Sequence, residues 1–236
     1  MAASSAAALT SAVGSATNPT EVLYLVAQHF LAQAEQLLLE TVTSDELLST
    51  TSKLSPGSSV GKHLRHLADH YKALFDALEG ADSTRSSSSS PTSSPPAPPP
   101  TASPTASSPS TLSPLRLDYD QRTRNVAAEH SHAAALAQFR QLRQRLDRLT
   151  GQGKDVDPDR EVRLEATTPV RVEVKTSFAR ELWFASFHAV HHFALVRVIA
   201  CGELGLTVPD DFGVAPSTLK HRESEASTTD ATPLKL

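Results

Sequence analysis

The sequence predicts an all-α protein, a four-helix bundle with a small β-hairpin before the fourth helix. Four segments repeat apolar residues at spacings of three and four, which is the period of a helix with one buried face. Between 162 and 174, Val and Leu alternate with charged residues, which predicts a two-stranded ribbon. A Ser- and Pro-rich stretch, residues 83–114, interrupts the bundle. We expect this low-complexity insertion to be disordered, because it cannot bury enough apolar surface to offset chain entropy.

The first two helices are predicted from their ends as well as from their apolar period. Asn18 is a capping residue, Pro19 suits the first helical position, and Glu21 completes a capping box, so the first helix covers residues 18–42. The second helix is predicted from Val60 to Glu79 and ends at a glycine, Gly80, where helices commonly stop.

The third helix is best defined in its second half, where leucines and Phe139 step by three or four until Gly151. The fourth helix runs from about Ser177 to Cys201. After it, prolines at 209 and 216 predict an extended segment laid over the bundle. The bundle therefore covers residues 18–222, between a leader (1–17) and a tail (223–236) that we expect to be disordered.

Composition excludes several classes of protein. Charge is nearly balanced, with 22 Lys and Arg against 26 Asp and Glu, which argues against nucleic acid and anionic membranes as partners. The N-terminal residues lack the basic region of a secretory signal, and no run reaches the 18 apolar residues of a transmembrane helix. One cysteine, Cys201, allows no intrachain disulfide. We expect a cytoplasmic protein, with organelle import as the alternative.

Histidine is the unusual residue, because six of the ten fall in two short windows. The windows are His63, His66 and His70, then His188, His191 and His192. At about 100° per residue, His188 and His192 lie one turn apart in the middle of the apolar face, and His191 lies nearer its edge. Two imidazoles at this spacing are how a helix offers two nitrogens to one metal ion.

A third ligand is expected from the second helix. Its three histidines span only about 60° of the helix surface, so the helical wheel does not choose among His63, His66 and His70. The alternative interpretation is that the histidines are hydrogen-bonded core residues, since a buried imidazole needs a partner for each nitrogen.

Glu129 is predicted to point inward from the third helix. It is a candidate general base, a residue that holds a ligand imidazole, or half of a salt bridge with Arg122 or Arg124.

Two motifs resemble the DinB-like (YfiT-like) four-helix-bundle family of metal-dependent enzymes. "SVGKHLRHLADHYKAL" is similar to the family's second helix, with a Ser followed by a His seven residues later, and "HAVHHFAL" is similar to the HxxxH of its fourth helix. The resemblance implies His66, His188 and His192 as the three metal ligands. It leaves His63, His70, His191 and Glu129 as alternates for the metal or for residues around it.

The function that the resemblance implies is that of a metal-dependent enzyme acting on a small-molecule substrate. The metal would be zinc, nickel or iron with open coordination positions, and the reaction would be thiol-dependent transfer or isomerisation. The chain departs from the family after the last histidine, where it reads Phe193 and Ala194. The alternative is a non-catalytic bundle with core or structural-metal histidines that serves as a binding module. A homodimer is compatible with either.

Overall fold

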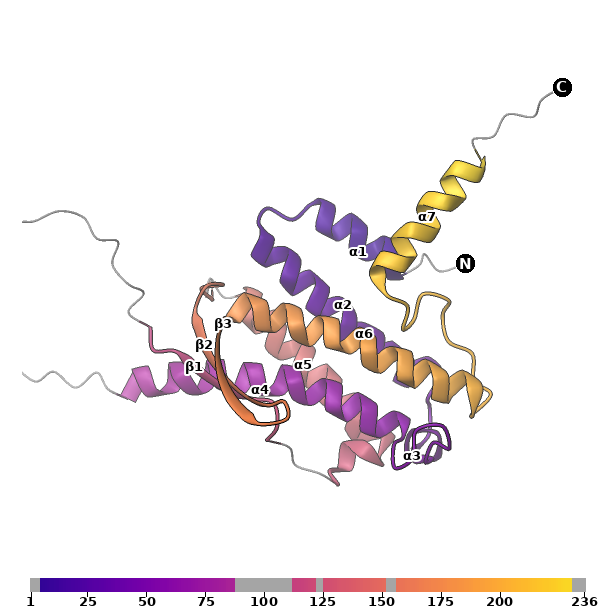
Figure 1. Cartoon of the computed structure of the whole chain (residues 1–236), viewed down its shortest axis with the longest axis horizontal. Helices are drawn as coiled ribbons and strands as arrows, with labels where there is room; N and C mark the ends of the chain where they lie inside the picture. The colour runs from indigo at the N-terminus through magenta and orange to yellow at the C-terminus, as the bar shows by residue number, and fades with distance from the viewer. Residues whose placement is uncertain (1–4, 88–111, 122–124, 152–155, 231–236) are drawn as a thin grey trace, which may run out of the picture.

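The computed structural model describes residues 5–87, 112–121, 125–151 and 156–230. Within this part the protein is mostly helical, with one small sheet (Figure 1). In chain order the elements are α1 (Ser5–Gly14), α2 (Pro19–Glu40), α3 (Asp45–Ser49), α4 (Val60–Ser87), β1 (Leu115–Asp118), the short 3₁₀ helix η1 (Ala127–Glu129), α5 (His132–Gly151), β2 (Glu161–Thr167), β3 (Arg171–Ser177), α6 (Phe178–Gly202) and α7 (Pro216–Asp230).

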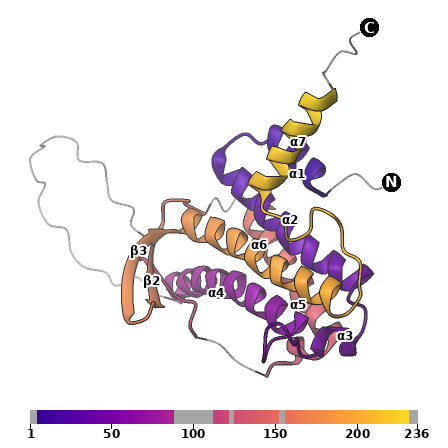
Figure 2. The same ribbon diagram turned by 45° about the vertical axis from the view of Figure 1, so that its right-hand side comes forward.

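The four long helices, α2, α4, α5 and α6, enclose the apolar core. Helix α4 packs against α5 and α6, and α2 packs against the same two helices from the other side (Figure 2). The α2 start predicted from sequence is confirmed, since the Asn18 side chain accepts a hydrogen bond from the Glu21 amide at 2.8 Å. The largest fully buried side chains of the core are Tyr71, Phe75, Phe139, Phe178 and Phe193.

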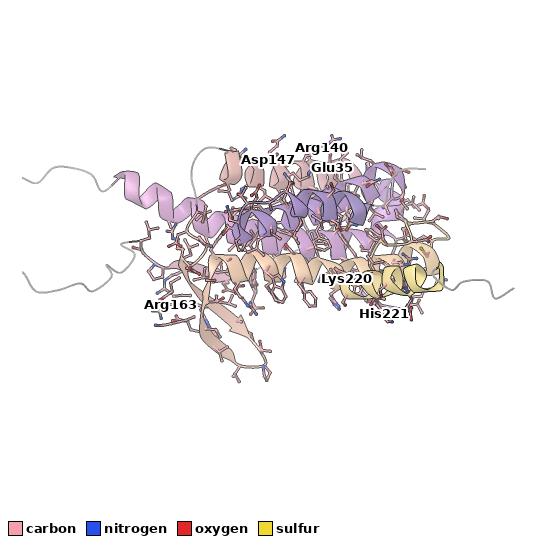
Figure 3. All side chains as sticks on the ribbon, turned by 90° about the horizontal axis from the view of Figure 1, so that it is seen from above. Glu35, Arg140, Asp147, Arg163, Lys220 and His221 are labelled. Atoms are coloured by element: carbon pink, nitrogen blue, oxygen red, sulfur yellow. The ribbon has the colours of Figure 1, made fainter. Side chains whose placement is uncertain are left out.

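Ion pairs tie α2 to α5 along the outer edge of this arrangement. The Glu35 carboxylate on α2 accepts from the side chains of Arg140, at 2.9 Å, and Arg143 on α5. Gln28 on α2 donates to Asp147, which lies one turn after Arg143 on α5. Figure 3 shows Glu35 and Arg140 next to each other at this edge. Arg140 is half-exposed, so we expect its ion pair to contribute little to stability.

The sheet caps the end of the helices where α6 begins (Figure 1). β2 and β3 form the predicted antiparallel ribbon, with Val162 opposite Thr176. A third strand was not predicted: β1 adds to β2 in parallel, with Leu115 opposite Val162. β1 is only four residues long, but Leu115 and Leu117 are buried on one side of it. β3 leads directly into α6, whose first residue follows Ser177.

Helix α6 is apolar around most of its circumference. Among the described residues it is the one helix with the length and hydropathy to cross a membrane, and half of that stretch is buried inside the protein. Its outer side nevertheless exposes Trp183, Phe187 and Val198. A core helix that is buried on most of its faces is as apolar as a helix that crosses a membrane.

Four expectations about boundaries differ from the structure. The leader contains α1, whose alanines favour a helix. α4 does not stop at Gly80 but continues to Ser87, because Ala81 still packs against the core. The tail and the segment expected to be extended contain α7, which starts with proline at its first position. The first half of the third predicted helix forms β1 and η1 instead. Residues 88–111 of the insertion lie outside the described residues.

We expect Gly61→Ala to destabilise the protein, because α4 approaches η1 closely at this glycine. A Cβ at position 61 would lie 2.3 Å from the backbone oxygen of Glu129 and 3.0 Å from Cγ of Leu48. Such overpacking costs about 1–3 kcal/mol of unfolding free energy. The matched control is Gly80→Ala on the same helix, where nothing lies within 4 Å. There we expect an increase of about 1 kcal/mol. Equal effects at both positions in a denaturant titration would contradict the expectation.

Candidate metal centre

The two histidine windows face each other across the contact between α4 and α6. The first window, His63, His66 and His70, lies on α4, and the second, His188, His191 and His192, lies on α6. His70 and His192 are buried, each only 6% exposed. His191 is exposed, which agrees with its place at the edge of the helical wheel.

Imidazole nitrogens contact one another at the centre of the cluster. Nε2 of His188 lies 3.4 Å from Nε2 of His66 and 3.0 Å from Nε2 of His192. Both contacts use the same nitrogen of His188, which in a neutral ring carries either one hydrogen or one lone pair and so can make one ordinary hydrogen bond to another imidazole. His188 thus contacts both of the other ligands that the resemblance implies, one on each helix.

His70 joins the same group from one turn further along α4. One ring nitrogen from each of His66, His70 and His188 lies within 4.8 Å of the other two, which is close enough for the three to share a metal ion. His70 also contacts the backbone, because its Nδ1 donates to the carbonyl oxygen of His66 at 3.0 Å.

His63 is not part of the group around His188. It contacts His192 through Nδ1, the ring nitrogen that does not contact His188. The two Nδ1 atoms are 3.0 Å apart, and Nε2 of His63 lies 2.6 Å from the Ser58 hydroxyl oxygen. His63 therefore occupies the place of a residue that orients a ligand imidazole through its second nitrogen. His191 contacts the cluster through its ring, which stacks on His188 with centroids 5.8 Å apart.

The donor set and its spacing fit a transition metal. With metal–nitrogen bonds of about 2.1 Å, two ligand nitrogens lie about 3.4 Å apart in a tetrahedral shell and about 3.0 Å apart at right angles. The distances from His188 to His66 and to His192 lie in the range that two ligands of one metal ion span. Imidazole ligands suit zinc, copper, iron and nickel, whereas magnesium and calcium prefer oxygen.

Burial keeps His192 neutral, which is the form that binds a metal. Desolvation, followed by the charges of His188, His66 and His63, lowers the pKa of His192 from 6.5 to about 2. Desolvation and then the charge of His191 lower the pKa of His63 as well. A neutral imidazole has one nitrogen lone pair available for coordination.

A tyrosine and a buried glutamate adjoin the cluster, and sequence reasoning did not assign them a role. The Tyr119 ring stacks on His70, with centroids 4.6 Å apart and planes 23° apart. Its hydroxyl donates to the carboxylate of the fully buried Glu181 at 3.0 Å. Burial, then the charge of Glu181, raises the pKa of Tyr119 well above its usual value. The one signal in the sequence is the alternate spacing of Leu115, Leu117 and Tyr119, which places Tyr119 on the same side of an extended segment as the two buried leucines.

Glu129 is buried, as predicted, but it contacts a different partner. Its carboxylate pairs with Nε of Arg65 at 3.0 Å, and Arg65 also pairs with Asp69 at 2.6 Å. The partners expected from sequence, Arg122 and Arg124, lie outside the described residues. The pairing with Arg65 favours the salt-bridge interpretation of Glu129 over that of a general base.

A cavity of about 320 Å³ lies on another side of α6, among α1, α2 and α7. Its lining includes His29, Phe30, Asp211 and the α6 residues Val190 and Phe193, and none of the six clustered histidines. This cavity is therefore separate from the candidate metal centre.

We expect metal-free protein to lose stability as the pH falls below 6.5. The folded state keeps His192 neutral, whereas the unfolded chain takes up a proton at the ordinary pKa of 6.5. The unfolded state then binds more protons, so the unfolding free energy falls by at most about 1.4 kcal/mol per pH unit. Urea titrations in chelator between about pH 7.5 and about pH 5 measure this slope. His192→Gln should flatten it and His221→Gln, at an exposed position on α7, should not. An unchanged slope in His192→Gln would contradict the assignment.

Glu129→Ala should lower stability without affecting metal content. The substitution leaves the buried Arg65 with a single partner, and breaking a buried ion pair costs about 3 kcal/mol. Thermal unfolding and elemental analysis of the same samples separate the two effects. Glu225→Ala, at an exposed position on α7, serves as the control for loss of a carboxylate. Loss of metal in Glu129→Ala at a temperature where the variant stays folded would mean that Glu129 belongs to the site.

Comparison with known proteins places the chain in a family. A profile of the DinB superfamily matches residues 28–196, from α2 through most of α6, and so includes both histidine windows. FK506-binding protein 5 of Rhizopus delemar is 36% identical over 113 residues, which are 48% of this chain and 29% of that protein. The chain thus spans less than a third of the length of this relative. No solved structure matches. The resemblance seen in the two motifs is confirmed, and the chain belongs to the DinB superfamily.

Proposed function

We propose that the protein is a metal-dependent enzyme in which His66, His188 and His192 hold a divalent ion. The observation that carries the proposal is that Nε2 of His188 meets two other imidazole nitrogens rather than backbone carbonyls. A core histidine of purely structural role needs only hydrogen-bond partners for its nitrogens, which backbone carbonyls commonly supply. Imidazole nitrogens that face one another in this way could instead offer lone pairs to a shared cation.

The bound ion would act on a small-molecule substrate. When bound, it would supply a Lewis acid that polarises a carbonyl or lowers the pKa of a coordinated thiol or water. Three ligands leave positions open for such a group. The reaction class, thiol-dependent transfer or isomerisation, rests on the family resemblance. The cytoplasm, where thiols stay reduced, is the compartment that suits it.

The chain's own residues would fix the ligands and exclude water. His63 holds Nδ1 of His192, which leaves Nε2 of His192 directed toward the other ligands. Phe184 stacks on His188 with ring planes 19° apart and gives that ligand an apolar neighbour. The four long helices, as the bundle of the family, would provide the rigid support that a preorganised site needs.

A second candidate function is a non-catalytic module. Most of FK506-binding protein 5 lies outside the match, so the similar residues there form one part of a longer protein. A module of this kind would use the histidines as a closed structural site. Access of an added ligand to the metal separates this candidate from the enzyme.

Metal analysis of protein purified without a histidine tag tests the main proposal. We expect about one equivalent of metal in the wild type after reconstitution with zinc, nickel or iron. His188→Ala should lose it, because His188 contacts both other ligands. The control is His221→Ala, which removes an exposed histidine on α7 and should keep the metal. Substoichiometric metal in the wild type after reconstitution would refute the proposal.

The enzyme and the module differ in the response of the metal to thiols. We expect the cobalt(II)-substituted protein to gain a sulfur-to-cobalt charge-transfer band when low-molecular-weight thiols are added, since an enzyme's ion keeps an open position. A spectrum that thiols do not change would favour the closed site of a structural module.

A further inference from the structure

We infer that His70 is a fourth metal ligand, held in place by Tyr119 and Glu181, so that the centre is a four-imidazole site. This inference rests on the proposed metal function and adds to it. The family resemblance supplies a single histidine from the second helix, whereas α4 directs two, His66 and His70, at His188.

The hydrogen bond from His70 to its own helix fixes which nitrogen can bind a metal. The carbonyl oxygen of His66 can only accept, so the hydrogen on the His70 ring must be on Nδ1. In the neutral ring the lone pair then lies on Nε2. Metal-binding histidines characteristically donate their second nitrogen to a carbonyl or carboxylate in this way.

The position of the ring agrees with its tautomer. The His70 ring lies 4.4 Å from that of His188 and 4.7 Å from that of His66, measured between centroids. One nitrogen of each ring lies within 4.8 Å of the other two. Because His188 also contacts His192, the four rings meet around His188.

Tyr119 packs against one face of the His70 ring. Its ring stacks on the imidazole, and its hydroxyl is anchored on Glu181. Glu181 is fully buried and also accepts from Thr176, at 2.9 Å, and Arg180, at 2.8 Å. Burying a carboxylate costs free energy unless its oxygens accept hydrogen bonds. One of the hydrogen bonds that Glu181 accepts comes from the Tyr119 hydroxyl and fixes the position of that side chain. Tyr119 and Glu181 are therefore positioning residues for His70.

With four imidazole ligands, the metal's coordination number decides whether a position remains open for a substrate. Four ligands fill the tetrahedral shell that zinc prefers in structural sites. Metals with five or six positions would keep one or two open for a substrate. Imidazole suits zinc, copper, iron and nickel alike, so the coordination number is what would favour nickel, iron or copper over zinc in an active centre of this kind.

Counting the ring nitrogens around bound copper(II) by pulsed electron paramagnetic resonance tests the inference on the full chain. We expect four coordinated imidazoles in the wild type and three in His70→Gln. The matched control is His191→Gln, which removes an exposed histidine next to the cluster and should leave four. Three imidazoles in the wild type, with no change in His70→Gln, would overturn the inference and leave the proposed function standing. Absence of bound copper in the wild type would overturn both.

Copper affinity tests the positioning role. Tyr119→Ala should weaken binding by about 10–100-fold, the effect usual for residues that orient a ligand. Tyr119→Phe should restore only part of it, because it keeps the stacked ring but loses the hydrogen bond to Glu181. If Tyr119→Ala lowers only the melting temperature and leaves the affinity unchanged, Tyr119 is a packing residue. The wild-type imidazole count requires no substitution, so the assignment of His70 stays testable even if a variant fails to fold.

Discussion

The packing of α4 against α6 is the contact on which the candidate site depends. Each helix carries three histidines, but neither helix alone brings more than two nitrogens to one point. The contact between His66 and His188 joins residues 122 positions apart in the chain. Because both helices also bury apolar side chains on their other faces, the core fixes their rotation, and with it the direction of each imidazole. The chemistry of the site is thus set by the hydrophobic packing around it.

The α6 half of the site could be predicted from sequence, and the α4 half could not. The apolar face of α6 is broad, so the places of His188, His191 and His192 relative to it follow from the helical period alone. On α4 the three histidines lie within a narrow sector, and a rotation of some tens of degrees would exchange which of them faces α6. That rotation depends on contacts with α5 and η1, such as the close approach at Gly61, and no local pattern encodes them.

The same reasoning explains why Tyr119 and Glu181 gained a role only in the structure. Glu181 is seven residues before His188 and too far along the helix axis to bind the same ion directly. It reaches the site through a tyrosine on the loop after β1, and β1 is placed by pairing with β2. The capping of α2 and the period of α5 are local signals and were read correctly. The strand β1, the helices α1 and α7 and the continuation of α4 past Gly80 depend on propensities and distant contacts too weak to predict from sequence.

The long separation between the two histidine windows has a consequence for the folding of the chain. A metal held by α4 and α6 would act as a cross-link that closes a loop of more than a hundred residues, which in the unfolded chain is entropically costly to close. Sequence added within that loop raises this cost only logarithmically, by about 0.6 kcal/mol for each doubling of its length. A long Ser/Pro insertion between the two windows is thus compatible with a preorganised site, because the geometry of the metal ligands is set by helix packing and not by the length of the chain that joins them.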